Sequence, residues 1–231
     1  GTTCIQFENN VRLTLKQTDF SKNEVLVQLR VGSGFLEIAS AKKPGLDKLA
    51  SVAFVEGGLI AHDITEIKRL FAGKTVGINC VVGDDALVFS AVTNQENLRD
   101  QLNLLCAYIC YPGFRNEALE EFRKNLETLY STFAHTAAGT FAQKISRYLV
   151  NGYERFGYAE KSVLEKRNFQ ELAETLRPIL EKGYIEICLV GDFNNEKAIE
   201  EVAETFGTLP LRLETKERLD DARKVEWPKN K

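Results

Sequence analysis

The amino-acid sequence predicts an α+β fold, in which helices cover one face of a two-layer, mostly antiparallel sheet. Several of the predicted strands are joined by tight turns, as the strands of antiparallel hairpins are. The helical segments are grouped between residues 96 and 182 and do not alternate one for one with strands. No linker-like composition or repeat divides the chain, so we expect one domain over residues 1–212 and a linker toward a following domain over 213–231.

The N-terminal part of the chain is expected to supply three strands. Residues 4–8 and 11–16 are typical of strands, and the Asn9-Asn10 pair between them is typical of a hairpin turn. A third strand is expected over 24–34. The second and third strands show the period of two that indicates one buried face, at Val11, Leu13, Leu15, Val25, Val27 and Leu29.

Two helices and a second hairpin are expected next. Residues 45–59 carry an apolar stripe at helical spacing between a Pro-Gly pair and a Gly-Gly pair. Asp63 and Glu66 have the spacing of a capping box at the start of a second helix, over 62–73. Strands are expected at 74–82 and 86–93, around the turn 83–85.

The remainder of the chain is predicted to be mostly helical. Pro178 lies inside one of these helices, where it predicts a kink because proline cannot donate the helical hydrogen bond. The helices are expected at 96–111, 115–133, 140–150 and 168–183, followed by a strand at 184–193 and a final helix at 195–210.

Composition limits the classes of function. The chain has 231 residues and a formal net charge of −3, which gives no reason to expect nucleic acid or an anionic membrane surface as a partner. No apolar run approaches the roughly 20 residues that a membrane-spanning helix needs. Four of the five cysteines lie in apolar stretches without CxxC spacing, so we interpret them as buried free thiols, which favours a reducing compartment. The four are Cys80, Cys106, Cys110 and Cys188.

Taken alone, the residues assign no chemistry to the chain. His62 and His135 are its two histidines, and neither has a second ligand at the spacing that a zinc site needs. Ser51 lies inside a predicted helix, and neither a GxSxG elbow nor a phosphate-binding glycine motif occurs. A hydrolase acting through a site of its own therefore has no residue constellation to support it.

Five segments, in this order and at this spacing, resemble the insulinase/pitrilysin family of zinc metallopeptidases, the inverzincins. They are FENNVRLTLKQTDF, EVLVQLRVGSG, GLDKLASVAFVEGGL, ITEIKRLFAGKTV and the terminal LVGDFN…TFGTLP. The resemblance covers residues 5–210 and is to a non-catalytic domain from the C-terminal half of a bacterial member. It implies the two-layer fold of the mitochondrial processing peptidase-like metallohydrolases.

In that family an active domain carries HxxEH on the helix after the third strand, where two imidazoles hold Zn²⁺ and the carboxylate activates water. The matching positions here are Lys48, Ser51 and Val52, and Glu127 is a carboxylate near the place of the family's downstream ligand. Lysine adds a positive charge, serine is no general base near neutral pH, and valine has no ligating atom. The resemblance thus predicts no catalytic, cofactor-binding or metal-ligating residue in this segment.

The resemblance implies a domain that helps to form the chamber of a zinc metallopeptidase and docks its peptide substrate without itself being catalytic. The parent protein is then expected to be a zinc metalloendopeptidase with zinc in another domain. Its expected partners are the other domains and the peptide, with no nucleic acid and no membrane. The alternative is a scaffold or protein-binding domain with no associated protease, as in the core subunits of the cytochrome bc1 complex. Bacterial relatives suggest a periplasmic location, whereas the free cysteines favour the cytoplasm.

Overall fold

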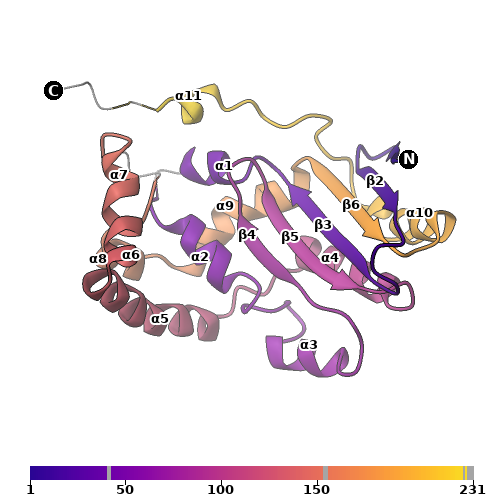
Figure 1. The fold of residues 1–231 in the computed structure, drawn as a ribbon, viewed down its shortest axis with the longest axis horizontal. Coiled ribbons are helices and arrows are strands. Elements are labelled where there is room, and N and C mark those ends of the chain that lie inside the picture. Colours follow the sequence, from indigo (N-terminus) through magenta and orange to yellow (C-terminus); the bar gives the residue numbers. More distant parts are fainter. Residues whose placement is uncertain (41–42, 153–155, 226, 228–231) are drawn as a thin grey trace.

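The structure, a computed structural model, describes residues 1–40, 43–152, 156–225 and 227. Within them six strands form one mixed sheet in the order β1-β2-β6-β3-β5-β4 (Figure 1). Strands β2 and β6 run parallel, and the other four neighbouring pairs are antiparallel, so the predicted sheet is confirmed. The strands are β1 (Thr3–Gln6), β2 (Arg12–Gln17), β3 (Val25–Val31), β4 (Asn79–Val82), β5 (Leu87–Thr93) and β6 (Ile185–Gly191).

Helices lie behind the sheet in Figure 1, and the face toward the viewer is open. In the view, α4 and α9 lie behind the strands, whereas α2 and α5 lie beyond the β4 edge. The longer helices are α2 (Leu46–Ala53), α3 (Ile64–Leu70), α4 (Leu98–Cys110), α5 (Asn116–His135), α9 (Phe169–Lys182) and α10 (Asn195–Glu204). The shorter ones are α1 (Phe35–Ser40), α6 (Ala137–Thr140), the π-helix η1 (Phe141–Ile145), α7 (Ser146–Tyr148), α8 (Lys161–Glu165), the 3-10 helix η2 (Phe206–Thr208) and α11 (Asp220–Arg223).

The hydrophobic core lies between the sheet and these helices. Along β3, alternate side chains are buried and those between them reach the open face, because successive strand residues point to opposite sides. Helices α4 and α9 turn apolar stripes of helical spacing toward the same layer. Burying one such aliphatic side chain contributes about 1.5–3 kcal/mol. Residues of this layer include Val25, Val27, Leu29, Val31, Leu98, Leu102, Leu105, Leu172 and Leu176.

The last strand of the chain, β6, lies in the middle of the sheet. It is inserted between β2 and β3, so that Ile187 is paired with Leu13 on one side and with Leu29 on the other. Its inward residues are buried, and every second residue reaches the open face. The two hairpin turns are local and were predicted, but the position of β6 depends on contacts between distant parts of the chain.

Side-chain caps begin four of the helices that the structure describes, namely α3, α6, α9 and α10. Asp63 and Glu66 form the predicted capping box of α3, in which each side chain accepts a hydrogen bond from the other residue's backbone N–H. Asn168 caps α9 by accepting from the Glu171 N–H at 2.9 Å. Asn194 caps α10 in the same way. Helix α9 then runs through Pro178 to Lys182.

The predicted strand over 74–82 is shorter than expected, and a buried glutamine explains why. Gln101 on α4 is fully buried, accepts from the Gly77 N–H at 3.0 Å and donates to the Gly77 carbonyl at 2.8 Å. Asn97, one turn earlier, accepts from the Thr75 N–H. Helix side chains therefore satisfy the backbone groups that a longer strand would have paired, and β4 begins only at Asn79.

Other element boundaries also differ from the sequence prediction. The helix predicted over 45–59 ends at Ala53, and the one predicted over 140–150 is divided into α6, η1 and α7. The strand predicted over 24–34 ends at Val31, because Gly32 and Gly34 both have φ of about +61°, which ends the extended backbone. The short helices α1, α8 and α11 had no clear sequence signal.

Candidate functional site

Helix α2 contains Lys48, Ser51 and Val52, the residues that the resemblance matches to the zinc motif of an active relative. It packs against β4, α5 and α9 and buries the side chains of its predicted apolar stripe. The stripe consists of Leu46, Leu49, Ala50, Ala53 and the following Phe54. The helix is therefore held as part of the core, and the question is what its other faces can do.

The side chains at the motif positions are committed to structural contacts. Lys48 Nζ lies 3.0 Å from Asp47 Oδ2 and 4.9 Å from the centre of the Tyr158 ring. Ser51 Oγ donates to the Asp47 carbonyl at 2.8 Å and accepts from the Val82 N–H at 3.0 Å. Val52 has no polar side-chain atom and is 51% exposed. An ammonium group, an engaged hydroxyl and an alkyl group do not fit a zinc ion and its activated water.

The other residues considered as ligands are dispersed. Glu127 on α5 is exposed and forms an ion pair with Lys161. His62 Nδ1 lies 3.5 Å from Glu66 Oε2 beside the α3 cap, and His135 is the last residue of α5. Among the residues that the structure describes, no group of three or more His, Cys, Asp or Glu side chains could hold a metal ion.

The cysteines are less buried than the sequence suggested. Cys80 on β4 is buried, and burial raises the pKa of its thiol. Cys106 and Cys188 are partly exposed, and Cys110 at the end of α4 is exposed, so the expectation of burial is wrong for Cys110. All five cysteines are free.

The open face of the sheet has an ordered pattern that the register defines. Its residues form rows across the strands, because paired residues lie on the same side of a sheet. The row at one end begins with Lys16 on β2 and continues over three strands with Val190, Leu26 and Val92, and we call these three residues the apolar row. The middle row is uncharged and consists of Cys4, Thr14, Cys188, Gln28, Ser90 and Asn79. The row at the opposite end consists of Gln6, Arg12, Glu186, Arg30, Val88 and Val81, of which three are charged.

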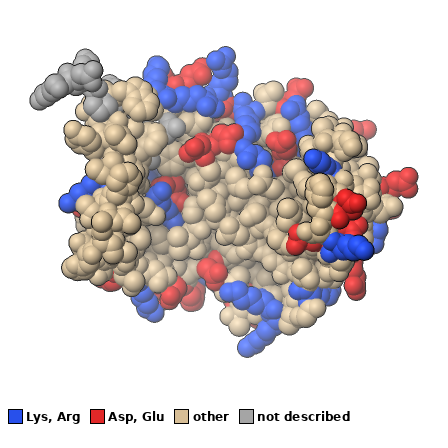
Figure 2. Space-filling model, viewed as in Figure 1, with Lys and Arg blue, Asp and Glu red and all other residues tan. Residues whose placement is uncertain are grey.

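A groove of about 670 Å³, which we call the apolar groove, lies over the apolar row and part of the middle row. From the middle row Gln28, Asn79, Ser90 and Cys188 line it. Leu26, Val92 and Val190 line its floor, and Ile78 in the segment before β4 is also among its lining residues. Leu26 and Val92, each next to the end of its strand, are 48% and 50% exposed, which is high for aliphatic side chains within a sheet. Figure 2 shows the centre of this face without charged residues and the charged side chains toward its borders. The groove therefore suits an apolar, uncharged segment.

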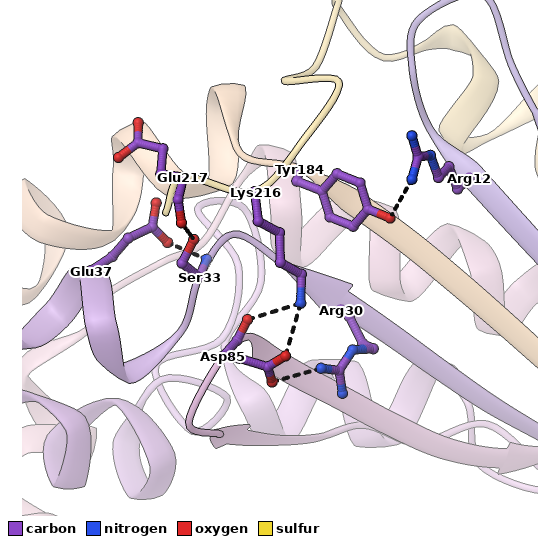
Figure 3. A network of polar contacts seen from close by, with 8 residues as sticks. All are labelled: Arg12, Arg30, Ser33, Glu37, Asp85, Tyr184, Lys216 and Glu217. Carbon is purple, nitrogen blue, oxygen red and sulfur yellow. Dashed lines mark hydrogen bonds and ion pairs between the residues drawn. The ribbon is translucent and has the colours of Figure 1, made fainter. Parts of the chain in front are cut away.

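The charged end of the open face holds a polar network (Figure 3). Asp85, in the turn between β4 and β5, pairs with Arg30 at 2.7 Å and with Lys216 at 3.2 Å. Burial alone would raise the pKa of Asp85, but the hydrogen bond and charge of Lys216 and the charge of Arg30 outweigh it and lower this pKa. The Ser33 hydroxyl donates to the Glu217 carbonyl at 3.3 Å. Part of the segment predicted as a linker is thus attached to the domain.

A second part of the network lies around Tyr184. The Tyr184 hydroxyl is 3.2 Å from Arg12 Nη1, and the Arg12 guanidinium also lies 5.2 Å from the centre of the Tyr184 ring.

Glu37 at the start of α1 accepts a hydrogen bond from the Ser33 N–H. Burial raises the pKa of Glu37, and this hydrogen bond partly counters the effect.

Comparison with solved structures shows which fold this is. PqqL from Escherichia coli, a periplasmic protease, matches 99% of the chain with a TM-score of 0.77 at 15% identity. A peptidase M16 inactive domain from Pseudomonas fluorescens matches 94% with a TM-score of 0.72 at 16% identity. The chain has the fold of the M16 peptidase domains. The fold expected from the insulinase/pitrilysin resemblance is therefore confirmed.

Two further likenesses agree with this fold. The ferredoxin protease FusC, in complex with Arabidopsis ferredoxin, matches 94% of the chain with a TM-score of 0.75 at 17% identity. In sequence, the chloroplastic stromal processing peptidase of Pisum sativum is 22% identical over 90% of the chain. No family model matches the sequence.

The chain corresponds to only a part of these larger proteins. It spans 17% of the stromal processing peptidase, 25% of the PqqL chain, 24% of the FusC chain and 53% of the Pseudomonas chain. Among the described residues, no helix has the length and apolar character to cross a membrane.

The apolar groove was missed by the sequence analysis, although a signal was present. A strand with one face toward water usually carries polar residues on that face. On β3 and β5 this holds for Gln28, Arg30 and Ser90, but the open-face positions at one end of these strands are taken by the aliphatic Leu26 and Val92. These two apolar residues are the signal in the sequence.

Proposed function

We propose that this chain is a non-catalytic domain of a zinc metallopeptidase, where it helps to enclose the reaction chamber and docks the peptide substrate. Its fold and its span of about a quarter of the PqqL chain support this assignment. The observation that carries it is the state of α2, which packs as a core helix, while Lys48, Ser51 and Val52, which the resemblance matches to the motif, make structural contacts or have no ligating atom. The metal and its base are then supplied by another domain of the parent protein.

Peptide docking is assigned to the face of the sheet and not to its β4 edge. An extended peptide that joins a sheet needs free backbone groups along an edge strand. Here the Val82 N–H already donates to Ser51 Oγ, and α2 packs along β4. The apolar groove is open, and neighbouring strands are about 4.8 Å apart, so its three-strand row spans roughly 10 Å. That width accommodates one or two apolar side chains of the substrate.

The function is tested on the purified full-length protein. We expect it to contain zinc, to cleave unstructured peptides, and to lose this activity when the metal is removed by chelation. Val52→Ala is expected to leave kcat and zinc content unchanged, because this helix takes no part in the chemistry. A full-length protein that binds no zinc and cleaves no peptide would refute the proposal and favour the scaffold alternative.

The docking role is tested by a charge placed in the apolar groove. Val92→Asp is expected to raise KM for an apolar peptide about 5- to 30-fold with kcat little changed. Val92 is already half-buried, so a bound peptide covers only the rest of its surface, which contributes about 1–2 kcal/mol. Val92→Thr, which keeps the shape, should give a smaller rise. Leu70→Asp is the matched control, because Leu70 is equally aliphatic and 61% exposed but lies on α3, away from the groove. Equal effects of Val92→Asp and Leu70→Asp would argue against docking in the groove.

A further inference from the structure

The apolar groove also contains three polar side chains to which the proposed function gives no role. Gln28, Ser90 and Asn79 line the groove and belong to the middle row of the open face. They stand side by side, because Ser90 is paired with Gln28 on one strand and with Asn79 on the other. Among the residues that the structure describes, none of these three side chains has a hydrogen-bond partner. We call them the polar trio.

The backbone of the strands beneath the groove is already engaged in the sheet. Strand β3 is paired with β6 on one side and with β5 on the other, and β5 lies between β3 and β4. A peptide that lies on this face therefore cannot add itself as a further strand. Its own N–H and C=O groups lose water on docking, and leaving them without partners is costly. On the floor of the groove, the polar trio is the set of side chains that can replace that water.

The side chains of Gln28 and Asn79 carry the same chemical groups as a peptide bond. Each carboxamide has a carbonyl that accepts and an NH₂ group that donates, so it can pair with the N–H and the carbonyl of a peptide backbone at once. The Ser90 hydroxyl between them both donates and accepts. Neighbouring strands are about 4.8 Å apart, so the polar trio spans roughly 10 Å, the length of about three residues of extended chain.

The charge and shape of the groove limit its occupant to an uncharged segment with an apolar residue. Although 27% of the chain is charged, none of the residues that line the groove is. On the open face, charged residues begin beyond it, with Lys16 next to Val190 and with Glu186 and Arg30 one row past the middle row. An ionised side chain over the groove would lose water without gaining a counter-charge. The apolar row lies about 7 Å along the strands from the polar trio, a distance that long apolar side chains reach.

We propose that Gln28, Ser90 and Asn79 bind the backbone of an extended, uncharged substrate segment of about three residues, which places one apolar side chain on the apolar row. This inference rests on the proposed docking role and names the kind of segment that docks. Backbone contacts do not depend on the identity of the side chains, so the polar trio holds many sequences and the apolar row selects among them. A proline over the polar trio is disfavoured, because proline has no N–H to donate.

The test measures binding to the purified full-length protein and does not depend on catalysis. Cys188 lines the groove and is partly exposed, whereas Cys4 is exposed in the same row but is not among the residues that line the groove. The probe is a short, end-blocked peptide with leucine at its centre and uncharged neighbours, added in excess. It is expected to slow the alkylation of Cys188 by N-ethylmaleimide and to leave that of Cys4 unchanged. Peptide mapping follows both sulphurs in one sample, and the dependence on peptide concentration gives Kd.

A second peptide, methylated on the backbone nitrogens beside the leucine, reports on the hydrogen bonds, because it keeps the side chains and loses the donors. Its Kd is expected to be about 2- to 12-fold higher for each hydrogen bond lost. Gln28→Ala and Asn79→Ala change exposed side chains and should weaken the unmodified peptide by a similar factor. They should weaken the methylated peptide less, since the same contact is already missing. Gln6→Ala is the matched control, an exposed glutamine on β1 that is not among the lining residues, and should change neither Kd.

The outcomes separate this inference from the docking role on which it rests. Equal protection of Cys188 by the two peptides would overturn the backbone contacts and leave docking by apolar burial in place. A peptide that docks as a helix would respond to methylation but not to Gln28→Ala or Asn79→Ala, and this result would also overturn them. If neither peptide protected Cys188, docking in the groove would itself be refuted, whatever zinc-dependent cleavage the full-length protein shows.

Discussion

Replacing Ser51 with alanine is expected to destabilise the domain without affecting chemistry, because Ser51 joins α2 to the edge of the sheet. Its Oγ accepts from the Val82 N–H at 3.0 Å, and the alanine variant leaves this backbone donor without its partner. An unsatisfied, partly buried donor costs about 1–3 kcal/mol. Alanine recovers about 0.5 kcal/mol through its higher helix propensity, so the expected loss is about 1–2 kcal/mol.

The loss can be measured as a change in the free energy of unfolding in urea, or as a fall in Tm of about 2–8 °C for a domain of this size. Val52→Ala is the matched control, since it changes the adjacent residue on the same helix but removes no hydrogen bond. It should stay within about 0.5 kcal/mol of the unaltered chain. If Ser51→Ala were as stable as the control, the structural role of Ser51 would be refuted. If it were stable but abolished zinc-dependent cleavage by the full-length protein, the view of α2 as catalytically silent would be wrong.

Two further predictions concern other polar contacts. Gln101→Leu should lower the free energy of unfolding, measured in urea, by about 2–4 kcal/mol, because the N–H and the carbonyl of Gly77 both lose their hydrogen-bond partner. An unchanged free energy of unfolding would contradict a stabilising role for these two hydrogen bonds. Asp85→Asn should speed hydrogen exchange around Lys216 at pH 7. The pKa of Asp85 is lowered in the fold, so its contribution is present above the unfolded value of about 3.9 and is lost as the pH falls through the folded value. The variant and the unaltered chain should therefore converge only once the pH lies below this lowered pKa. A difference that persists at low pH would show that the ion pairs with Asp85 are not its cause.

Local signals account for the parts of the fold that the sequence predicted. The Asn9-Asn10 turn, the Asp63–Glu66 capping box and the alternation along β3 each depend on residues a few positions apart. Because these signals are local, the sequence mispredicted element boundaries that depend on contacts with distant residues. The start of β4 is set by Gln101, which lies on a different element, and propensity near residue 77 contains no trace of it.

Only part of the candidate site could be predicted, again because sequence signals are local and the site combines residues from distant elements. The resemblance matched Lys48, Ser51 and Val52 to the motif positions. It gave no sign of the hydrogen bond from the Val82 N–H to Ser51, which needs β4 beside the helix. The apolar row was not recognised, because Leu26, Val92 and Val190 come from three strands that only the register brings together. Cys110 was expected to be buried since its neighbours are apolar, yet the end of α4 leaves it exposed.

The central position of β6 determines when this domain can complete its folding during synthesis. The β1–β2 hairpin contacts the rest of the sheet only through β6, whose residues come about 170 positions after β2. Until the ribosome has released β6, the hairpin and the β3–β5–β4 unit are two separate pieces with unpaired inner edges. Such long-range closure slows folding and exposes strands that can pair wrongly. A nascent chain that stalls before residue 185 is therefore expected to be a substrate for chaperones.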